Sequence, residues 1–293
     1  MMKAPVNRII PFSNVDGPGN RTALFFQGCP YNCLYCHNPE TIRLCVNCGA
    51  CVSGCPVKAL SVSAPGKVTW DAKACVGCDA CIRTCPNDAS PRIRWMTVDD
   101  VMRELQRTAP YTVGVTTSGG ECTLYAGFLI ELFGRVRKLG KTCLIDSNGS
   151  YDFEQGAALL AACDGVMLDV KAVEPEWCAR LVGHPPDGML RNLDHLLKVG
   201  KLQEVRTVIF PDRDRDNAET VRYTAGRIGD ACDYKIIPTV PLASGPAIGL
   251  CSGRRRPTRI TRNASSASPA TPERPERLWC RTVPASHSKR RPL

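Results

Sequence analysis

The chain has 293 residues and carries 38 Lys and Arg against 28 Asp and Glu, a formal net charge of +10. Residues 251–293 hold eleven basic and two acidic groups, so the rest of the chain is nearly neutral and gives no case for a nucleic-acid enzyme. Its 18 cysteines, without an apolar run of signal-peptide or membrane-span length, exclude small disulfide scaffolds and favour metal binding in a reducing cytoplasm.

The body of the chain alternates strand and helix patterns. Apolar, β-rich runs predict six strands, at 22–27, 112–117, 142–146, 165–170, 204–210 and 234–237. Helical spacing predicts helices at 97–108, which opens on a capping box at Thr97, and at 125–139, 153–162 and 190–199. This alternation predicts an α/β fold of parallel βα units, in which six strands form a partial barrel and functional loops follow the carboxyl ends of the strands.

Two cysteine runs share the spacing Cys-x2-Cys-x2-Cys-x3-Cys-Pro. This is the bacterial ferredoxin spacing, in which the fourth cysteine of each run serves the other cluster. The predicted ligand sets of two [4Fe-4S] clusters are Cys45, Cys48, Cys51 with Cys85, and Cys75, Cys78, Cys81 with Cys55. Structural zinc is the alternative, and eight cysteines in two matching runs disfavour it.

A third cysteine group, Cys29-x3-Cys33-x2-Cys36, directly follows the first predicted strand. Three thiolates on a four-iron cluster leave one iron open, and an open coordination position is typical of a catalytic metal site. Such a triplet alone is a weak signal. Its place after a buried strand, where a βα loop carries a site, strengthens it.

The triplet, with Tyr35 before its last cysteine, resembles the signature of radical S-adenosylmethionine (SAM) enzymes. The runs at 15–21 and 35–41 resemble the glycyl-radical-enzyme activating enzymes, and the resemblance covers about residues 7–238. The double ferredoxin block is similar to that of the YjjW-type activases. The resemblance implies a partial (β/α)6 radical SAM barrel at 1–40 and 95–238, with an inserted ferredoxin-like α+β domain at 41–94.

The resemblance also implies the activity. Members of the family cleave SAM reductively to a 5′-deoxyadenosyl radical, which takes an α-hydrogen from a glycine of a partner glycyl radical enzyme. The cofactors would be three [4Fe-4S] clusters, SAM and a monovalent cation, with a flavodoxin- or ferredoxin-type electron donor. The alternative is a ferredoxin-like electron carrier without catalytic activity, for which SAM and reductant would give no 5′-deoxyadenosine.

Several segments at strand ends resemble the SAM-binding motifs of this family. Gly119 and Gly120 resemble a motif whose backbone meets the methionine ammonium, although an isolated Gly-Gly pair more often marks an ordinary turn. Asp146 and Ser147 resemble a segment near the ribose and the cation. Tyr35, Cys36 and His37 belong to the same predicted set, with the His37 backbone beside the adenine.

Asp169, Val170 and Lys171 resemble a further family segment, in which Lys171 faces the SAM carboxylate and Asp169 supports the cation. The plainer interpretation is a solvated charge pair at a strand end. Arg206 precedes Thr207, where family members often carry a histidine that reaches SAM. Arg206 is therefore included in the predicted set as the substitute for that histidine.

Residues 239–293 do not continue the βα pattern. They are rich in Arg, Pro, Ser and Thr and cannot support a core, so they are predicted to be disordered or the product of a shifted reading frame. A nucleic-acid-binding role for this basic tail is a third hypothesis. It is disfavoured because the tail lacks interleaved aromatic residues.

Overall fold

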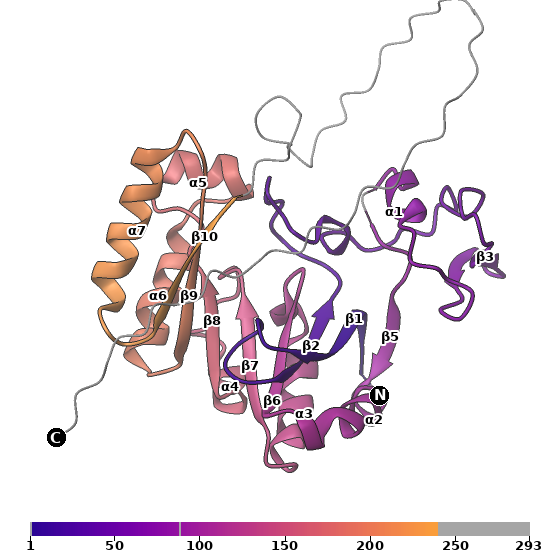
Figure 1. Ribbon diagram of the computed structural model, residues 1–293, viewed down its shortest axis with the longest axis horizontal. Coiled ribbons are helices and arrows are strands. Elements are labelled where there is room, and N and C mark those ends of the chain that lie inside the picture. Colours follow the sequence, from indigo (N-terminus) through magenta and orange to yellow (C-terminus); the bar gives the residue numbers. More distant parts are fainter. Residues whose placement is uncertain (1, 88, 240–293) are drawn as a thin grey trace, which may run out of the picture. The chain divides into compact units, whose positions relative to one another are not determined.

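The computed structural model describes residues 2–87 and 89–239. An eight-stranded mixed sheet runs in the order β10-β9-β8-β7-β6-β2-β1-β5 (Figure 1). Its six parallel strands are the predicted ones: β2 Arg21–Phe26, β6 Gly114–Gly119, β7 Thr142–Ser147, β8 Gly165–Asp169, β9 Leu202–Ile209 and β10 Asp233–Pro238. The prediction of an α/β fold is confirmed. Residues 240–293, which include almost all of the predicted tail, lie outside the described residues.

Two antiparallel strands that the sequence pattern does not predict extend the sheet beyond β2. Strand β1, Lys3–Ser13, pairs with β2 on one side and with β5, Arg94–Thr97, on the other. β1 contains Pro5 and Pro11 and its register shifts twice against β2, so it lacks the regular alternation of a strand pattern. β5 has only four residues, too few for a periodic signal.

Four helices confirm the predicted ones within a few residues: α2 Val98–Thr108, α3 Ala126–Arg137, α4 Ala157–Ala162 and α6 Asp187–Lys198. The predicted capping box is formed, since Asp100 N–H donates to Thr97 Oγ1 at 3.2 Å and Thr97 N–H donates to Asp100 Oδ2 at 2.8 Å. Three more helices have no counterpart in the predicted pattern: α1 Ala80–Thr84, α5 Pro175–Val182 and α7 Asp214–Ile228. Short 3-10 helices lie at Pro39–Thr41, Ala109–Tyr111 and Cys122–Tyr125.

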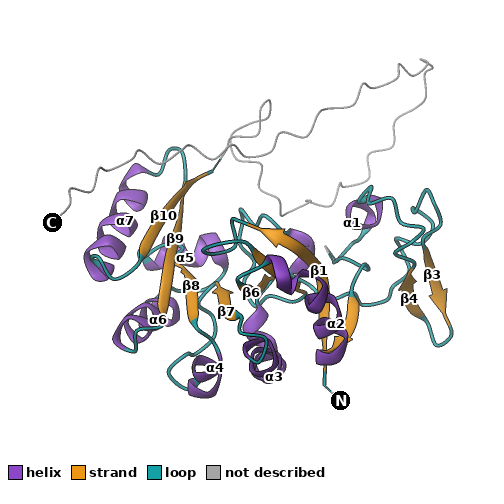
Figure 2. Cartoon of the chain, turned by 60° about the horizontal axis from the view of Figure 1, so that its bottom comes forward, coloured by secondary structure: helices purple, strands orange, loops and turns teal. Residues whose placement is uncertain are grey.

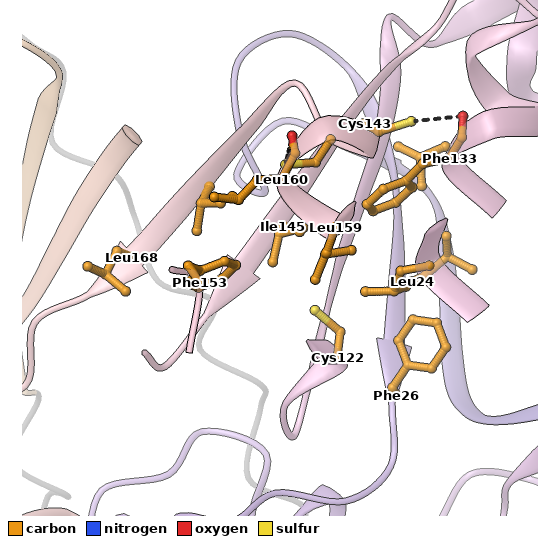
Figure 3. Close-up of a cluster of buried hydrophobic side chains, with 14 of the residues drawn as sticks. Leu24, Phe26, Cys122, Phe133, Cys143, Ile145, Phe153, Leu159, Leu160 and Leu168 are labelled. Carbon is orange, nitrogen blue, oxygen red and sulfur yellow. Dashed lines mark hydrogen bonds between the residues drawn. The ribbon is translucent and has the colours of Figure 1, made fainter. Parts of the chain in front are cut away.

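The main core lies between the sheet and the helices along it (Figure 2). Phe26 and Ile145 of the strands pack in one cluster with Phe133 and Leu159 of the helices (Figure 3). Cys143 is buried in the same cluster with its thiol 3.9 Å from the Phe133 carbonyl oxygen, so it behaves as a small apolar residue. Within the described ranges, no helix combines the length and the apolar character needed to cross a bilayer.

Residues 41–94 contain an antiparallel hairpin of β3 Leu60–Ser63 and β4 Lys67–Trp70, followed by α1 Ala80–Thr84. Cys51, Leu60 and Cys81 form a separate small buried cluster here. The segment begins and ends at neighbouring points, because Arg43 and Ala89 form an isolated parallel bridge. It therefore forms a closed excursion between β2 and β5.

Arg21 is a buried cation at the start of β2. Its Nε donates to Thr116 Oγ1 at 2.8 Å, its Nη1 to Thr142 Oγ1 at 3.0 Å and its Nη2 to the Val115 carbonyl oxygen at 2.9 Å. Burial lowers the pKa of Arg21. The guanidinium thus joins the starts of β2, β6 and β7 through acceptors that have little access to water.

We expect Arg21→Met to lower the free energy of unfolding of the apo chain by about 3 kcal/mol, because it leaves buried acceptors without donors. Urea unfolding under anaerobic conditions measures this loss. Arg103→Met is the matched control, since the Arg103 side chain is 68% exposed and its loss should cost no more than about 0.5 kcal/mol. Equal losses in the two variants would contradict the structural role of Arg21.

Candidate active site

The loop after β2 carries the three cysteines of the predicted catalytic triplet: Cys29, Cys33 and Cys36. The backbone of this loop is fastened to the end of α5. Asn32 N–H donates to the Val182 carbonyl oxygen at 3.0 Å, and Leu34 N–H donates to the Leu181 carbonyl oxygen at 2.9 Å. Cys33 lies between these two bonds, so helix α5, which the sequence does not predict, positions the middle cysteine.

All three thiols of the triplet are partly buried. Burial raises the pKa of Cys29 to about 12 and that of Cys33 to about 11, and it also raises the pKa of Cys36. Among the described residues, no three His, Cys, Asp or Glu side chains converge on a position for one metal ion. The thiolates of a four-iron cluster bind separate irons, so such convergence is not what that cluster needs.

Gly119 and Gly120 pack directly against the base of the cysteine loop. A methyl group on Gly119 would lie 2.2 Å from the Phe26 nitrogen, and one on Gly120 would lie 2.2 Å from the Gly28 carbonyl oxygen. Gly120 N–H also donates to the Phe26 carbonyl oxygen at 2.9 Å. Only glycine fits at these two positions, and the requirement comes from the backbone of β2 and of the cysteine loop that follows it.

Glu121 is a buried carboxylate that joins the loops after β6 and β7. Its Oε2 accepts from the Asn148 N–H at 2.8 Å, and its Oε1 accepts from the Thr123 hydroxyl at 2.7 Å. Burial raises the pKa of Glu121, and these hydrogen bonds oppose that rise. Asn148 Nδ2 in turn lies 3.3 Å from Cys29 Sγ. The three loops after β2, β6 and β7 are therefore connected through two polar side chains.

Neither Glu121 nor Asn148 was included in the predicted set. The sequence held a signal for both, because Glu121 ends the Gly-Gly-Glu run and Asn148 follows Ser147 directly. Ser147, which was included, is buried and its hydroxyl accepts from the Gly149 N–H at 3.1 Å. Its contacts therefore serve the turn after β7.

Asp146 lies near the end of β7, beside Arg206 of β9. Arg206 Nη1 is 3.2 Å from Asp146 Oδ1, and the Ser118 hydroxyl donates to Asp146 Oδ2 at 2.9 Å. Arg206 Nε also lies 2.5 Å from Glu204 Oε1. Burial raises the pKa of Asp146 against the opposing effect of Arg206. Burial alone would lower the pKa of Arg206, but the two carboxylates raise it.

Thr207 is buried on β9 and its hydroxyl is engaged within the sheet. It donates to the Val170 carbonyl oxygen at 2.9 Å and lies 2.9 Å from the Tyr234 hydroxyl, which donates to it. Val170 N–H donates to the Arg206 carbonyl oxygen at 2.8 Å. The residue at the expected histidine position thus holds β8, β9 and β10 together.

Lys171 and Asp169 form a close pair at the end of β8, with Lys171 Nζ 2.5 Å from Asp169 Oδ2. Lys171 Nζ also lies 5.5 Å from the centroid of the Tyr35 ring. Burial alone would lower the pKa of Lys171, but Asp169, Tyr35 and Cys33 raise it well above its ordinary value. Lys171 therefore stays an ammonium beside the cysteine loop.

The Tyr35 hydroxyl is buried and has no hydrogen-bond partner among the described residues. Burial raises the pKa of Tyr35, so the phenol stays neutral. A buried polar atom without a partner is uncommon in folded proteins and calls for an explanation, such as a missing ligand. The orphan hydroxyl beside Lys171 fits a polar ligand at this place. His37, by contrast, has an exposed side chain.

The chain is similar in sequence to a known family of proteins. The Radical SAM superfamily model matches residues 24–224. The benzylsuccinate synthase activating enzyme of Thauera aromatica is 33% identical over 245 residues, 76% of this chain and 73% of the relative. The pyruvate formate-lyase-activating enzyme of Streptococcus mutans is 31% identical over 223 residues, 72% of this chain and 68% of the relative. The chain belongs to the radical SAM superfamily, among its glycyl-radical enzyme activating enzymes.

A further member of this family has a similar extent of likeness. The trans-4-hydroxy-L-proline dehydratase activating enzyme of Clostridioides difficile is 31% identical over 222 residues, 70% of this chain and 73% of the relative. The radical SAM match begins within β2 and includes the cysteine triplet and the ends of β6, β7 and β8. Every segment of the predicted SAM site therefore lies inside the matched region.

The two four-cysteine runs of this radical SAM chain form loops of similar conformation. Asn47 and Gly49 of the first run have φ of 59° and 75°, and the equivalent Gly77 and Asp79 of the second have φ of 68° and 59°. The turns that follow are also equivalent. Val52 N–H donates to the Gly49 carbonyl oxygen at 3.0 Å, and Ile82 N–H donates to the Asp79 carbonyl oxygen at 3.1 Å. Identical spacing has thus produced two similar loops, of which the second continues into helix α1.

A small cavity in this block is lined by one of the two predicted ligand sets: Cys55, Cys75, Cys78 and Cys81. The fourth cysteine of the first run therefore shares a cavity with three of the second, as the exchanged pattern of ferredoxins requires. Burial raises the pKa of Cys51, and the thiols of Cys45, Cys81 and Cys85 raise it further. Two of these belong to the same predicted set as Cys51.

Proposed function

We propose that the chain uses SAM to install a glycyl radical on a partner enzyme. The triplet of Cys29, Cys33 and Cys36 would hold a [4Fe-4S] cluster with one open iron for SAM. One electron entering the sulfonium gives methionine and a 5′-deoxyadenosyl radical, which takes a hydrogen atom from a glycine α-carbon of the partner. The observation that carries this proposal is the connection of the cysteine loop, through Asn148 and Glu121, to the loops after β6 and β7.

The residues at the strand ends would bind and orient SAM. The backbone of Gly119 and Gly120 would meet the methionine ammonium, and Lys171 would face the methionine carboxylate. Asp146, Ser147, Asp169 and Val170 would line the ribose and a monovalent cation, and Tyr35, Cys36 and His37 the adenine, where the orphan Tyr35 hydroxyl offers an unused hydrogen-bonding group. Arg206 would act through Asp146, because its guanidinium is already paired with two carboxylates.

Residues 41–94 would form an inserted ferredoxin-like domain with two further [4Fe-4S] clusters, which would place the chain with the YjjW-type activases. The repeated loop conformation and the cavity lined by four cysteines support this assignment. These clusters would pass electrons from a flavodoxin- or ferredoxin-type donor to the SAM-binding cluster. The barrel would then comprise residues 1–40 and 95–238.

Anaerobic reconstitution of the chain tests the proposed activity. With SAM and dithionite, an activase forms 5′-deoxyadenosine and methionine, and a glycyl radical enzyme supplied as substrate acquires an EPR-visible radical. The alternative, a ferredoxin-like electron carrier, takes up iron and exchanges electrons but forms no 5′-deoxyadenosine. The cysteine triplet favours the activase, since a pure carrier has no use for an open iron.

Lys171 provides a direct test of SAM orientation. We expect Lys171→Met to weaken SAM binding by about 30-fold, or about 2 kcal/mol, because it removes a buried cation opposite a carboxylate. Equilibrium binding of SAM to the reconstituted chain measures the change, with iron content as a check. Lys198→Met, which removes an exposed lysine at the end of α6, should bind SAM normally. Normal binding by an iron-replete Lys171→Met variant would remove Lys171 from the site.

A further inference from the structure

The two four-cysteine sets have matching backbones but different side-chain surroundings. The repeat of 30 residues that relates Cys45 to Cys75 also relates Gly49 to Asp79 and Val62 to Arg92. Within the first site Gly49 lies beside Val62, and within the second Asp79 lies beside Arg92. Val62 Cγ2 lies 3.6 Å from where a methyl group on Gly49 would be, and Arg92 Nη2 lies 2.6 Å from Asp79 Oδ1. The first site thus has an aliphatic side chain where the second has a guanidinium.

Arg92 and Trp70 both line the cavity that contains Cys75. Arg92 is held there by Asp79 and its side chain is only 21% exposed. The Trp70 Nε1 is buried and makes no hydrogen bond with any described residue. Two side chains that line the cavity of the four cysteines thus carry an indole N–H without an acceptor and a positive charge.

The surroundings of the first set are less polar at the equivalent place. Asn47 N–H donates to Cys45 Sγ at 3.4 Å. Among the described residues, Asn87 offers this set a neutral amide, whose Nδ2 lies 3.9 Å from Cys48 Sγ. The second site thus differs from the first in the indole N–H and the guanidinium that line its cavity.

We propose that Trp70 and Arg92 make the cluster held by Cys75, Cys78, Cys81 and Cys55 easier to reduce than its neighbour. Reduction adds one electron, and so one negative charge, to a cluster without making or breaking a bond or moving a proton. Hydrogen bonds to the sulfurs and nearby positive charge stabilise that added charge and raise the reduction potential. When a low-potential one-electron donor has reduced only one of the two clusters, the reduced cluster is therefore the second.

This inference rests on the proposed function, in which each four-cysteine set holds a cluster. The test is a redox titration of the reconstituted full-length chain with dithionite, followed by EPR. The clusters are distinguished through Cys48→Ser and Cys78→Ser, which alter equivalent, exposed ligands of the first and second sets. We expect the signal altered by Cys78→Ser to appear first on reduction.

Trp70→Phe and Arg92→Gln are then expected to make that same cluster harder to reduce. At a fixed potential, the ratio of reduced to oxidised cluster should fall about tenfold in each variant, which is 59 mV for a one-electron couple. The other two clusters should keep their midpoints. Trp95→Phe and Arg94→Gln are matched controls, because these residues lie on β5 with exposed side chains, and they should leave all midpoints unchanged.

Iron content distinguishes failure of the cluster assignment from failure of the proposed tuning. If the chain binds only the iron of the triplet, the inserted-domain part of the proposed function fails. If all clusters load but Trp70→Phe and Arg92→Gln shift neither midpoint, or shift both equally, the proposed tuning is wrong and the cluster assignment stands. The tuning is also overturned if the signal altered by Cys48→Ser appears first.

Discussion

Cys33→Ala is expected to reduce the formation of 5′-deoxyadenosine from SAM to the level of the iron-free chain. Removing one positioned electrostatic group costs an enzyme about 100- to 1,000-fold in kcat, and loss of a cluster ligand should exceed this. Cys33 lies between two backbone bonds to the end of α5, so the loop holds its backbone in a fixed position. Product assay by chromatography and iron analysis measure the two parts of this effect.

Cys232→Ala is the matched control for this experiment. Cys232 is a partly buried cysteine beyond α7 that belongs to none of the predicted ligand sets. Its removal should leave both iron content and 5′-deoxyadenosine formation unchanged. Retention of SAM cleavage by Cys33→Ala, with a normal iron content, would show that Cys33 is not a ligand of the catalytic cluster.

Gly120→Ala is expected to destabilise the apo chain by about 3 kcal/mol, at the upper end of the usual cost of overpacking. The added methyl group would lie 2.2 Å from the Gly28 carbonyl oxygen and 2.8 Å from the Thr41 carbonyl oxygen. Both contacts are with backbone, so the base of the cysteine loop has to move. Thermal or urea unfolding measures the stability, and iron uptake reports on the loop.

Gly134→Ala offers a control with the opposite sign. Gly134 lies in helix α3, is exposed, and has open space where its methyl group would be. Alanine should stabilise the helix there by about 1 kcal/mol. If Gly120→Ala unfolds like the parent chain, the glycine is not required by packing, and its role would have to come from the ligand alone.

The sequence predicted the parts of the fold that carry a strong periodic signal. Strands such as β2 and β8 are buried apolar runs, although β10 is largely exposed, and α2 opens on a capping box that the structure forms. Helix α7 was missed because its buried positions are few and include Thr220 and Thr224, so it has no apolar stripe to detect. Its place is set by packing against β9, which a single segment does not reveal.

The candidate site was predictable to the extent that its residues lie in local motifs. Cysteine spacing singles out three sets of candidate ligands, and the strand ends single out Asp146, Asp169 and Lys171. What local patterns do not contain is the contact between motifs. The bond from Asn148 to Glu121 joins residues 27 positions apart, and the pairing of Arg206 with Asp146 crosses from β9 to β7. Such contacts arise from the order of strands in the sheet.

The bridge between Arg43 and Ala89 bears on how such a chain arises. The cysteine-rich segment begins and ends at two residues that pair with each other, so a chain without it would need only a short turn from the end of the triplet loop to the residues before β5. Closing a shorter loop costs slightly less entropy, and no strand would change its neighbour. The segment can therefore be gained or lost in evolution while the sheet keeps its strand order.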